Sequence, residues 1–321
     1  MTALRPLMQA AGINAFGAEV QLLELAAPRA PAADEIVIAV QAAGVGNWDE
    51  VARVGDWDLG RGPPLALGVE AAGIVAEVGP KVTSFVPGDE VLTHPLPLRD
   101  QGAWAEQLLA PASLVARKPA AVSWEAAAAF PVPALTAEQA LAEAVPAPEG
   151  AWVLVNGAGG VTGGLVVQLA VARGASVIAT AGPSSAARVR GAGASVVLDY
   201  HDPVWPSRAR EASPDGLGVA AAVNAARGGA RAALKAVRDN GSLATITGDP
   251  PPPERGVAVA DVYVRADGAP LAGLVTALAD GELSLRVGTV SPLAAAATAL
   301  EAAVTASAAG ASVLRVRTNL L

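Results

Sequence analysis

The feature that most constrains this fold is an apolar strand that runs directly into a glycine-rich turn and then into a helix. Residues 151–155 form the predicted strand, residues 156–163 (NGAGGVTG) the turn, and residues 165–171 the start of an apolar helix. Glycines let the backbone turn tightly and approach an anion closely, and the first amides of the helix point at that anion. This order predicts a βα turn that holds the pyrophosphate of a dinucleotide.

The spacing of the glycines fits only looser versions of the dinucleotide-binding motif, because the strict G-x-G-x-x-G pattern is absent. Both Ala158-x-Gly160-x-x-Gly163 and Gly157-x-x-Gly160-x-x-Gly163 match such versions. The alternative is a glycine-rich connection that binds no ligand. If the turn binds a cofactor, we expect the contacts to come from Ala158, Gly159, Gly160, Val161, Thr162 and Gly163.

The composition argues against several classes of function. Cysteine is absent from the 321 residues, which removes disulfides, thiolate nucleophiles and cysteine-ligated zinc. Only His94 and His201 offer imidazole, and two scattered histidines do not build a histidine-rich metal site, so we predict no tightly bound metal. The net charge of −8 repels phosphate backbones and disfavours nucleic-acid binding.

Membrane and export signals are not evident in the sequence. No apolar run reaches membrane-spanning length without an interrupting glycine, proline or polar residue. Residues 1–6 (MTALRP) lack the basic and then apolar pattern of a signal peptide. We therefore expect a soluble, cytoplasmic protein without a membrane partner, and the length suggests two domains.

The secondary-structure pattern changes along the chain. Short strands between glycine and proline turns, typical of a barrel or sandwich, are predicted at 35–41, 73–79, 90–93, 104–109 and 114–117. One helix is expected after Ser123, which we expect to cap it, and another over 136–143. From residue 151, strands and helices alternate at 151–155, 161–173, 175–180, 184–191, 195–198, 219–223, 229–238 and 241–246. This alternation predicts an α/β fold with helices on both faces of a parallel sheet.

The last part of the chain has a different pattern. The prolines at 250–253 are interpreted as a stiff connector. Beyond them we expect helices at 271–279 and 293–306 and a final strand at 311–317.

Five ordered segments resemble the medium-chain dehydrogenase/reductase superfamily. Besides the glycine turn, they are residues 64–79 (PLALGVEAAGIVAEVG), 86–91 (VPGDEV), 102–106 (GAWAE) and 126–141. Their order and spacing are similar to the family over nearly the whole chain. Within the family the chain resembles the zinc-free quinone oxidoreductase branch, which includes zeta-crystallin-like enzymes. The reason is that Val69 stands beside Glu70, where zinc-containing members carry a histidine.

The resemblance implies an α/β fold class with a GroES-like β-rich catalytic domain and a Rossmann domain built on a doubly wound parallel sheet. The cofactor is expected in the cleft between them. The expected boundaries are 1–122 for the first catalytic segment, 123–255 for the Rossmann domain and 256–321 for the segment that completes the catalytic domain. The family also tends to pair through Rossmann sheet edges, so we expect a homodimer.

The end of the second Rossmann strand distinguishes NADPH from NADH. NAD-specific sites place a carboxylate there, but residues 177–185 contain no Asp or Glu, so a 2′-phosphate meets no repulsion. This favours NADPH, although the lysine that related enzymes often place near Ala186 is missing. Expected contacts are Thr180, Gly182, Ser184, Arg188 and Tyr200, the last matching a family tyrosine after the third strand. The alternatives are an exposed helix face for Arg188 and ordinary strand-end packing for Tyr200.

The nicotinamide end of the site is implied by the resemblance. Thr136 matches a position close to the nicotinamide ribose, and Thr247, Gly248 and Val264 match positions that line the nicotinamide. Ligands bind at the carboxyl ends of parallel strands, which suits the first two of these three. The alternative is a routine transition from strand to loop.

Hydride chemistry without zinc favours an activated double bond, as in a quinone or an enone, because no metal polarises the carbonyl. Negative charge then builds on the carbonyl oxygen, where a few hydrogen-bond donors or water can hold it. The family carries an asparagine-containing loop that aligns imperfectly with residues 44–50, and we expect Asn47 to orient the carbonyl. The alternative is that Asn47 caps the helix that follows.

Other residues near this loop have two interpretations each. His94 is the candidate for proton delivery near pH 7, with simple exposure in its proline-rich loop as the alternative. Asp49 is expected in the first turn of a helix rather than as a general acid. Trp48 and Trp57 either form an aromatic wall for a flat substrate or pack in the core.

Together these observations predict an NADPH-dependent, zinc-independent oxidoreductase that transfers hydride to a small-molecule quinone or α,β-unsaturated carbonyl. Two alternatives remain open. One is an NADPH-binding protein with little catalysis. The other is an enoyl-reductase-type tailoring enzyme of a biosynthetic pathway.

Overall fold

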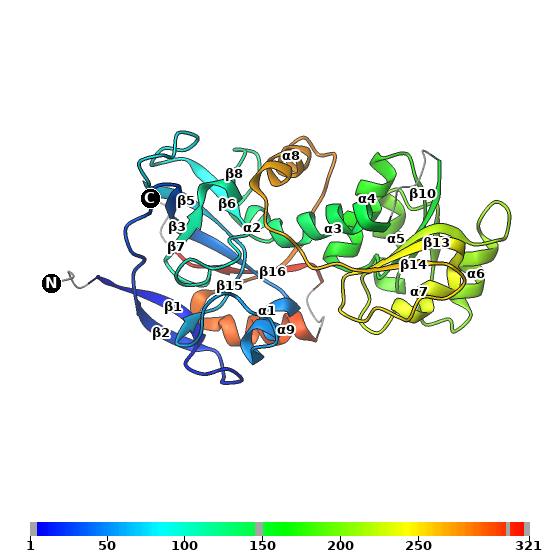
Figure 1. Ribbon diagram of the computed structural model, residues 1–321, viewed down its shortest axis with the longest axis horizontal. Coiled ribbons are helices and arrows are strands. Elements are labelled where there is room, and N and C mark those ends of the chain that lie inside the picture. The colour runs from blue at the N-terminus through cyan, green and yellow to red at the C-terminus, as the bar shows by residue number, and fades with distance from the viewer. Residues whose placement is uncertain (1–4, 145–149, 306–308, 318–321) are drawn as a thin grey trace. The chain divides into compact units, whose positions relative to one another are not determined.

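The computed structural model describes residues 5–144, 150–305 and 309–317, which divide into two compact units (Figure 1). The first unit combines residues 1–132 with 265–321, and the second spans residues 133–264. The chain thus leaves the first unit and returns to it, as the resemblance implies. The divisions fall at 132/133, inside helix α3 (Pro131–Ala144), and at 264/265, against the expected 122/123 and 255/256.

The second unit is built on a six-stranded sheet of order β11-β10-β9-β12-β13-β14. All its strand pairs are parallel. The strands are β9 (Trp152–Asn156), β10 (Ser176–Thr180), β11 (Val196–Leu198), β12 (Val219–Asn224), β13 (Val237–Thr245) and β14 (Ala258–Asp261). Taken in chain order this is 3-2-1-4-5-6, the doubly wound Rossmann arrangement, so the predicted fold class is confirmed.

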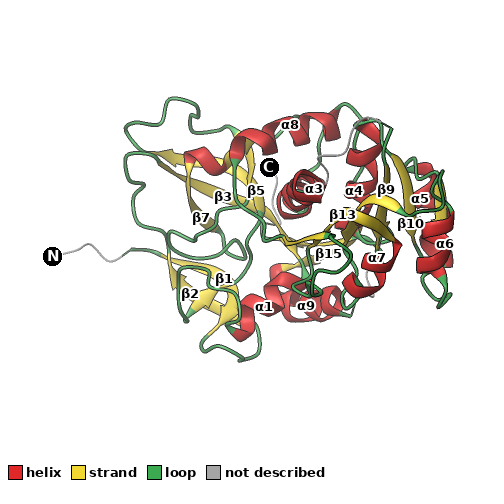
Figure 2. Cartoon of the chain, turned by 45° about the vertical axis from the view of Figure 1, so that its right-hand side comes forward, coloured by secondary structure: helices red, strands yellow, loops and turns green. Residues whose placement is uncertain are grey.

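Helices cover this sheet because its central strands are apolar on both faces. Val153, Leu154 and Val155 of β9 are completely buried, as expected for a strand inside a parallel sheet. The helices between the strands are α4 (Val161–Ala172), α5 (Pro183–Gly191), α6 (Trp205–Glu211) and α7 (Ala230–Ala236), and Figure 2 shows them beside the strands. Helix α4 packs on β9 and β10, and α7 on β12 and β13. The carboxyl ends of the strands therefore share one edge of the sheet, where a ligand is expected.

The first unit is mainly β-structure in two sheets. A seven-stranded sheet has the order β15-β16-β3-β5-β6-β8, with β7 also paired to β3, and a three-stranded sheet has the order β2-β1-β4. The strands are β1 (Leu7–Ile13), β2 (Gln21–Ala26), β3 (Glu35–Val45), β4 (Leu65–Ala66), β5 (Ala71–Val78), β6 (Glu90–Thr93), β7 (Gln107–Pro111), β8 (Val115–Arg117), β15 (Val287–Pro292) and β16 (Ala311–Arg315). Strand β16 pairs with β3, so the two ends of the chain share a sheet.

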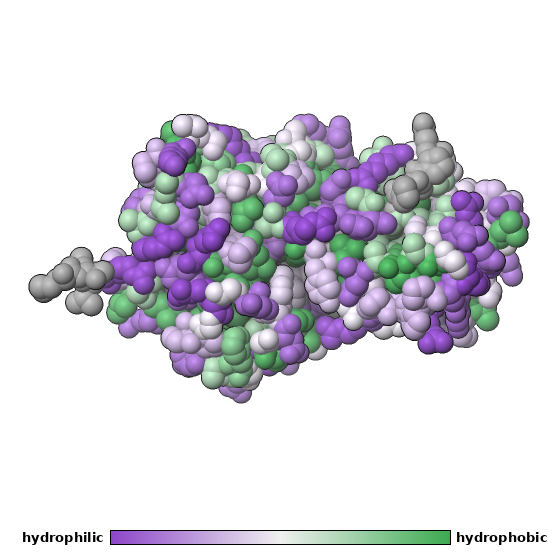
Figure 3. Space-filling view, viewed as in Figure 1, coloured by the Kyte–Doolittle hydropathy of each residue, from purple (hydrophilic) through white to green (hydrophobic). Residues whose placement is uncertain are grey.

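Helices α1 (Asn47–Val54), α2 (Trp124–Ala128), α8 (Gly268–Ala279) and α9 (Ala296–Val304) complete the first unit. Its core contains Trp104 and β-branched residues of β3 and β5, with Leu300 of α9 packed among them. Ser123 caps α2 as predicted, since its hydroxyl accepts the amide of Ala126 at 3.2 Å. None of the described helices is long and apolar enough to cross a membrane, and hydrophilic and hydrophobic residues mix on the face in Figure 3.

The predicted elements mostly match the observed ones, with shifted boundaries. Helix α3 begins five residues earlier than the predicted helix at 136–143, and β7 begins at Gln107 rather than at Trp104. Position 306 of the predicted helix at 293–306 lies outside the described residues. Strands β1, β2, β4, β14 and β15 and helix α6 were not predicted. Strand β14 follows the proline connector and is held by its pairing with β13, a contact that local pattern does not reveal.

Candidate functional site

The glycine turn between β9 and α4 depends on two glycines for its shape. Gly157 has φ of 86°, in the left-handed region that favours glycine. A Cβ on Gly163 would lie 2.2 Å from the carbonyl oxygen of Gly157, so the helix can approach the turn only without a side chain there. Gly160 differs, because its nearest neighbour would lie 3.5 Å away and the residue is exposed. The space beside Gly160 is therefore free of the chain itself.

The amides of the turn fall into two groups. Gly157 donates to the hydroxyl of Thr180 at 2.9 Å, and Ala158 donates to the carbonyl of Thr180 at 3.0 Å. Ala158 and Thr180 are completely buried, so these two predicted contacts shape the turn instead of offering donors. The amides of Val161, Thr162 and Gly163, in the first turn of the 12-residue helix α4, have no hydrogen-bond partner within the described residues. Three free amides at a helix N-terminus form an anion site.

The adenosine side of the turn is formed by α5. The Arg188 guanidinium donates to the carbonyl of Gly159 at 2.8 Å, which brings this exposed side chain to the turn. A Cβ on Gly159 would lie 2.6 Å from Oγ of Ser185, so Ser185 also reaches the turn. Gly182 caps α5, which begins with Pro183, and Ser184 lies exposed in its first turn. The structure therefore brings Arg188 and the start of α5 together beside Gly159.

Tyr200 lies at the same end of the sheet, beyond β11. Its ring carbon Cε1 would be 3.1 Å from a Cβ on Gly182, and its ring is 53% exposed. Tyr200 is thus neither buried in the strand packing nor remote from the predicted site. It covers the end of β10, where NAD-specific enzymes place a carboxylate.

A chain of buried hydrogen bonds runs beneath the turn, along the carboxyl ends of β10, β9 and β12. The Thr180 hydroxyl, which accepts the Gly157 amide, donates to Oδ1 of Asn156 at 2.6 Å. The Asn156 amide donates to Oδ1 of Asn224 at 2.8 Å. The conformation of the turn is therefore held from strand to strand.

This chain continues to β13. The Asn224 amide lies 3.0 Å from the hydroxyl of Thr245 and 2.9 Å from that of Thr247. The carboxylate of Asp249 accepts from both hydroxyls. Sequence reasoning found Thr247 but missed Asn156, Asn224 and Asp249. The available signal was a polar residue that ends each of two apolar strands, VLVN and AAVN.

The remaining predicted nicotinamide contacts belong to the same unit. Thr136 lies buried on α3. Gly248 is exposed with φ of 67°, and Val264 is half-buried in the segment after β14. A Cβ on Gly248 would lie 3.8 Å from the hydroxyl of Tyr263, which is itself exposed.

Helix α1 in the first unit presents Asn47 to solvent. The N-cap is Gly46, and Asn47 is the exposed first residue of the helix, so the alternative that Asn47 is the cap is wrong. The carboxyl of Asp49 accepts the Gly46 amide at 2.9 Å, as a residue of the first helical turn does. The Asn47 amide is therefore free of the capping role.

Asp49 and Glu70 are buried acids of the same unit. Burial raises the pKa of Asp49 to about 8, and the hydrogen bond from Gly46 offsets only part of that rise. Burial also raises the pKa of Glu70 well above its usual value, with a further rise from Asp49. Glu70 accepts the Val132 amide at 2.9 Å. Asp49 is therefore mostly neutral near pH 7, and burial favours the neutral form of Glu70 as well.

His94 is completely buried, so the alternative of simple exposure is wrong. Its Nδ1 lies 2.6 Å from the carbonyl oxygen of Val69, which only accepts, so Nδ1 carries the proton. Burial lowers the pKa of His94 to about 4. The expectation that His94 titrates near pH 7 is therefore corrected, since the ring stays neutral there. Its Nε2 is buried with no hydrogen-bond partner in the part of the chain that the structure describes.

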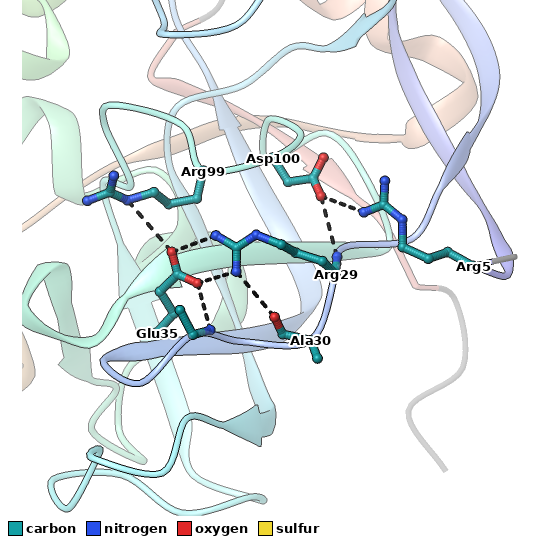
Figure 4. Close-up of polar contacts among 7 residues, drawn as sticks. Arg5, Arg29, Ala30, Glu35, Arg99 and Asp100 are labelled. Carbon is teal, nitrogen blue, oxygen red and sulfur yellow. Dashed lines mark hydrogen bonds and ion pairs between the residues drawn. The ribbon is translucent and has the colours of Figure 1, made fainter. Parts of the chain in front are cut away.

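The loop that follows His94 is held by ion pairs (Figure 4). Asp100 accepts from Arg5 at 2.8 Å and from the backbone amide of Arg29 at 3.4 Å. The guanidinium of Arg29 makes a two-pronged contact with Glu35 at 2.6 and 2.9 Å, which lowers the pKa of Glu35. These contacts tie the loop to the first strands of the chain, so they bear on the position of His94.

Trp48 and Trp57 are both half-buried, so neither interpretation of them is decided. The Trp48 ring fills the space beside Gly46, and its Nε1 is buried without a partner in the described residues. The Trp57 ring lies 6.5 Å from that of His94.

Comparisons with known proteins agree with this architecture. Residues 32–120 match the family described as the alcohol dehydrogenase GroES-like domain. The quinone oxidoreductase of Lama guanicoe is 34% identical over 186 residues, covering 57% of this chain and 55% of that protein. The chain therefore spans about half the length of this curated relative.

Two solved structures match nearly the whole chain. A mycobacterial protein complexed with NADPH is 30% identical with a TM-score of 0.84, covering 96% of this chain and 100% of that one. An NAD-dependent alcohol dehydrogenase is 28% identical with a TM-score of 0.88, covering 97% and 100%. With the GroES-like match and the Rossmann strand order, these similarities show that the chain belongs to the medium-chain dehydrogenase/reductase superfamily, in its zeta-crystallin-like quinone oxidoreductase branch.

Proposed function

We propose that this protein is an NADPH-dependent, zinc-independent oxidoreductase that transfers hydride to a quinone or an α,β-unsaturated carbonyl compound. The observation that carries the proposal is the set of three free amides at the start of α4, in a turn that its glycines shape. Family membership adds a nicotinamide chemistry to this anion site.

The residues present fit a dinucleotide. The amides of Val161, Thr162 and Gly163 would hold the pyrophosphate, and the open space beside Gly160 leaves room for it. Arg188, at the turn, would add positive charge toward a 2′-phosphate. No carboxylate ends β10, which supports NADPH over NADH. Because one of the similar structures is an NAD-dependent alcohol dehydrogenase, NADH is the competing cofactor that the assay must include.

The proposal of zinc independence rests on which metal-binding side chains the chain has and where they lie. Val69 occupies the place where zinc-containing members carry a histidine, and the chain has no cysteine. Within the described residues, no group of three or more histidine, aspartate or glutamate side chains is placed to hold a metal ion. The buried acids of this region are already engaged, since Asp49 accepts the Gly46 amide and Glu70 accepts the Val132 amide.

The chain's own residues supply orientation and hydrogen bonds, while a bound nicotinamide supplies the hydride. The exposed side-chain amide of Asn47 donates to the carbonyl oxygen of the acceptor, where negative charge builds as the β-carbon takes the hydride. His94 is neutral near pH 7 and carries its proton on Nδ1, so in this proposal its Nε2 accepts a hydrogen bond and the residue does not act as an acid. Water then protonates the enolate, so no side-chain acid is required.

The remaining contacts position the nicotinamide. Thr247 and Gly248 follow β13, and the Thr247 hydroxyl is held by Asn224 and Asp249. Thr136 and Val264 complete the set that the family resemblance implies. We further propose a cytoplasmic homodimer that pairs through an edge strand of the six-stranded sheet, β11 or β14. Light scattering on a size-exclusion column tests the dimer, since a monomer at working concentrations contradicts it.

The test of the function is the absorbance of NADPH, followed with a panel of quinones and enones and repeated with NADH. Consumption with one acceptor class, faster with NADPH and undiminished by a chelator, supports the proposal. Tight NADPH binding without turnover on any acceptor favours the binding protein with little catalysis. Stoichiometric zinc in the purified protein contradicts zinc independence.

A further inference from the structure

An aromatic pair, Tyr200 and His201, covers the end of the second Rossmann strand. The two ring centroids lie 4.0 Å apart. A Cβ on Gly182 would lie 3.1 Å from Cε1 of Tyr200 and 3.6 Å from Cε1 of His201. The imidazole therefore lies beside the N-cap of α5, although sequence reasoning assigned His201 no role.

Asp199 holds the His201 ring in one orientation. Its Oδ1 accepts the backbone amide of His201 at 3.0 Å and lies 2.7 Å from Nδ1 of the ring. These two bonds lower the pKa of Asp199, so it is a carboxylate near pH 7. With Nδ1 engaged, Nε2 is the free nitrogen, and the side chain is 60% exposed. The ring thus presents one nitrogen to solvent from a fixed position.

The position matters because of what a dinucleotide places there. NAD-specific Rossmann sites put a carboxylate at the end of the second strand to bind the ribose hydroxyls. Here Gly182 occupies that place, and an imidazole covers it. On the side toward the phosphate turn, Arg188 reaches Gly159. The group added to the ribose in NADPH is a phosphate, which both side chains can recognise.

We infer that His201 is a specificity-determining residue that binds the 2′-phosphate of NADPH through Nε2 while Nδ1 stays on Asp199. This inference rests on the proposed function, since it assumes that the cofactor lies on the glycine turn. Because Nδ1 is bonded to Oδ1 of Asp199 at 2.7 Å, the ring lies between that carboxylate and the nitrogen that we assign to the phosphate. Asp199 therefore does not oppose the phosphate directly, as it reaches the site only through the ring.

The experiment separates the 2′-phosphate from the rest of the cofactor. Calorimetry at about pH 6.5 compares adenosine 2′,5′-bisphosphate with adenosine 5′-monophosphate. The proteins are the full chain, its His201→Gln variant and the control Arg190→Gln. Arg190 is an exposed cation on α5, two residues from Arg188, so the control removes charge from the same region.

We expect His201→Gln to weaken the binding of the bisphosphate about tenfold, which is the size of one lost charge-assisted hydrogen bond. The affinity for the monophosphate should change less than about twofold. Arg190→Gln should change neither affinity by more than about twofold. Because His201 is exposed, its replacement should leave the melting temperature unchanged. The ratio of NADPH to NADH affinities should fall by the same factor as the ratio for the two adenosine phosphates.

Three results overturn the inference alone. The first is unchanged discrimination in His201→Gln, and the second is a full chain that binds bisphosphate no tighter than monophosphate while still binding NADH. If the full chain binds no adenosine phosphate and neither dinucleotide, the proposed function itself fails together with the inference. The third result is a loss of bisphosphate affinity in Arg190→Gln equal to that in His201→Gln. Equal losses would indicate a long-range effect of charge instead of a contact between His201 and the phosphate.

Discussion

Two clusters of buried polar side chains, one in each unit, differ in how completely they are hydrogen-bonded. In the Rossmann-like unit, Asn156, Thr180 and Asn224 are nearly or completely buried, and each is hydrogen-bonded to the next. In the GroES-like unit, Oδ1 of Asp49 and Nε2 of His94 are buried with no partner in the described residues. Paired networks rigidify a structure, whereas unpaired buried groups cost free energy and concentrate at functional sites. The comparison suggests a rigid cofactor platform in one unit and the less satisfied, reactive surroundings in the other.

The largest effect on cofactor binding is expected at Gly160, in the glycine turn of the Rossmann-like unit. Replacing Gly160 with leucine fills the space beside the free amides. It should weaken NADPH binding about 1,000-fold, or ~4 kcal/mol in binding free energy. The chain itself leaves this space open, so the melting temperature should hold. Fluorescence titration with NADPH measures the affinity, and Gly191→Leu is the matched control because a Cβ there meets nothing within 4 Å. Unchanged affinity in Gly160→Leu would show that the turn is not the phosphate cradle.

The next effect is on stability, at Asp49 in the GroES-like unit, whose Oδ1 is buried without a partner in the described residues. Asp49 has a pKa of about 8 when folded, above that of an unfolded aspartate, so folding binds a proton between these values. Wild-type stability is therefore lost as pH rises from about 4 toward 8. Asp49→Asn keeps an acceptor for Gly46 but cannot ionise, so its stability relative to wild type should rise by about 5 kcal/mol over that range, at roughly 1.4 kcal/mol for each unit between the two pKa values.

Urea denaturation of both proteins at several pH values measures the difference in the free energy of unfolding. A difference that stays constant with pH contradicts a buried, neutral Asp49. Glu70→Gln serves as a second variant, since the Glu70 pKa is also raised by burial and by Asp49 and should give a change of the same sign.

The contribution of the hydrogen-bonded network to stability can be measured at Asn224, which bonds to several of its members. Asn224→Ala removes the hydrogen bonds to Asn156, Thr245 and Thr247, leaving buried groups unsatisfied, and should lower the free energy of unfolding by about 2 kcal/mol. Asn14→Ala, at an exposed position, is the control. A loss no larger than in the control would mean that the network does not stabilise this unit, and the contrast between the units would fail.

The smallest effect is expected at the exposed Asn47. Asn47→Ala should lower turnover about tenfold, because one hydrogen bond to the developing charge is lost, and should change NADPH affinity less than about twofold. Steady-state kinetics and a binding titration separate the two quantities. Equal loss in both would indicate a structural role for α1, and no loss in either would remove Asn47 from the site.

Some features of the site followed from local pattern and others did not. The glycine turn was predictable because strand, glycines and helix are contiguous, and so was the parallel sheet that carries it. Asn156 and Asp249 were not, because their partners lie on other strands. The exposure predicted as an alternative for His94 was wrong for a similar reason. A histidine beside prolines looks like surface loop, but His94 is completely buried and its Nδ1 donates to the carbonyl of Val69, 25 residues earlier in the chain.

The sequence by itself determined the order of the elements, the Rossmann-like strand pattern, the family and the absence of cysteine ligands. These depend on residue types and spacings that act over one turn or one strand. Only the tertiary structure decided which turn amides are free, which acids are neutral and which ring covers Gly182. Burial and hydrogen bonding set those properties, and both come from residues far apart in the chain that folding brings together.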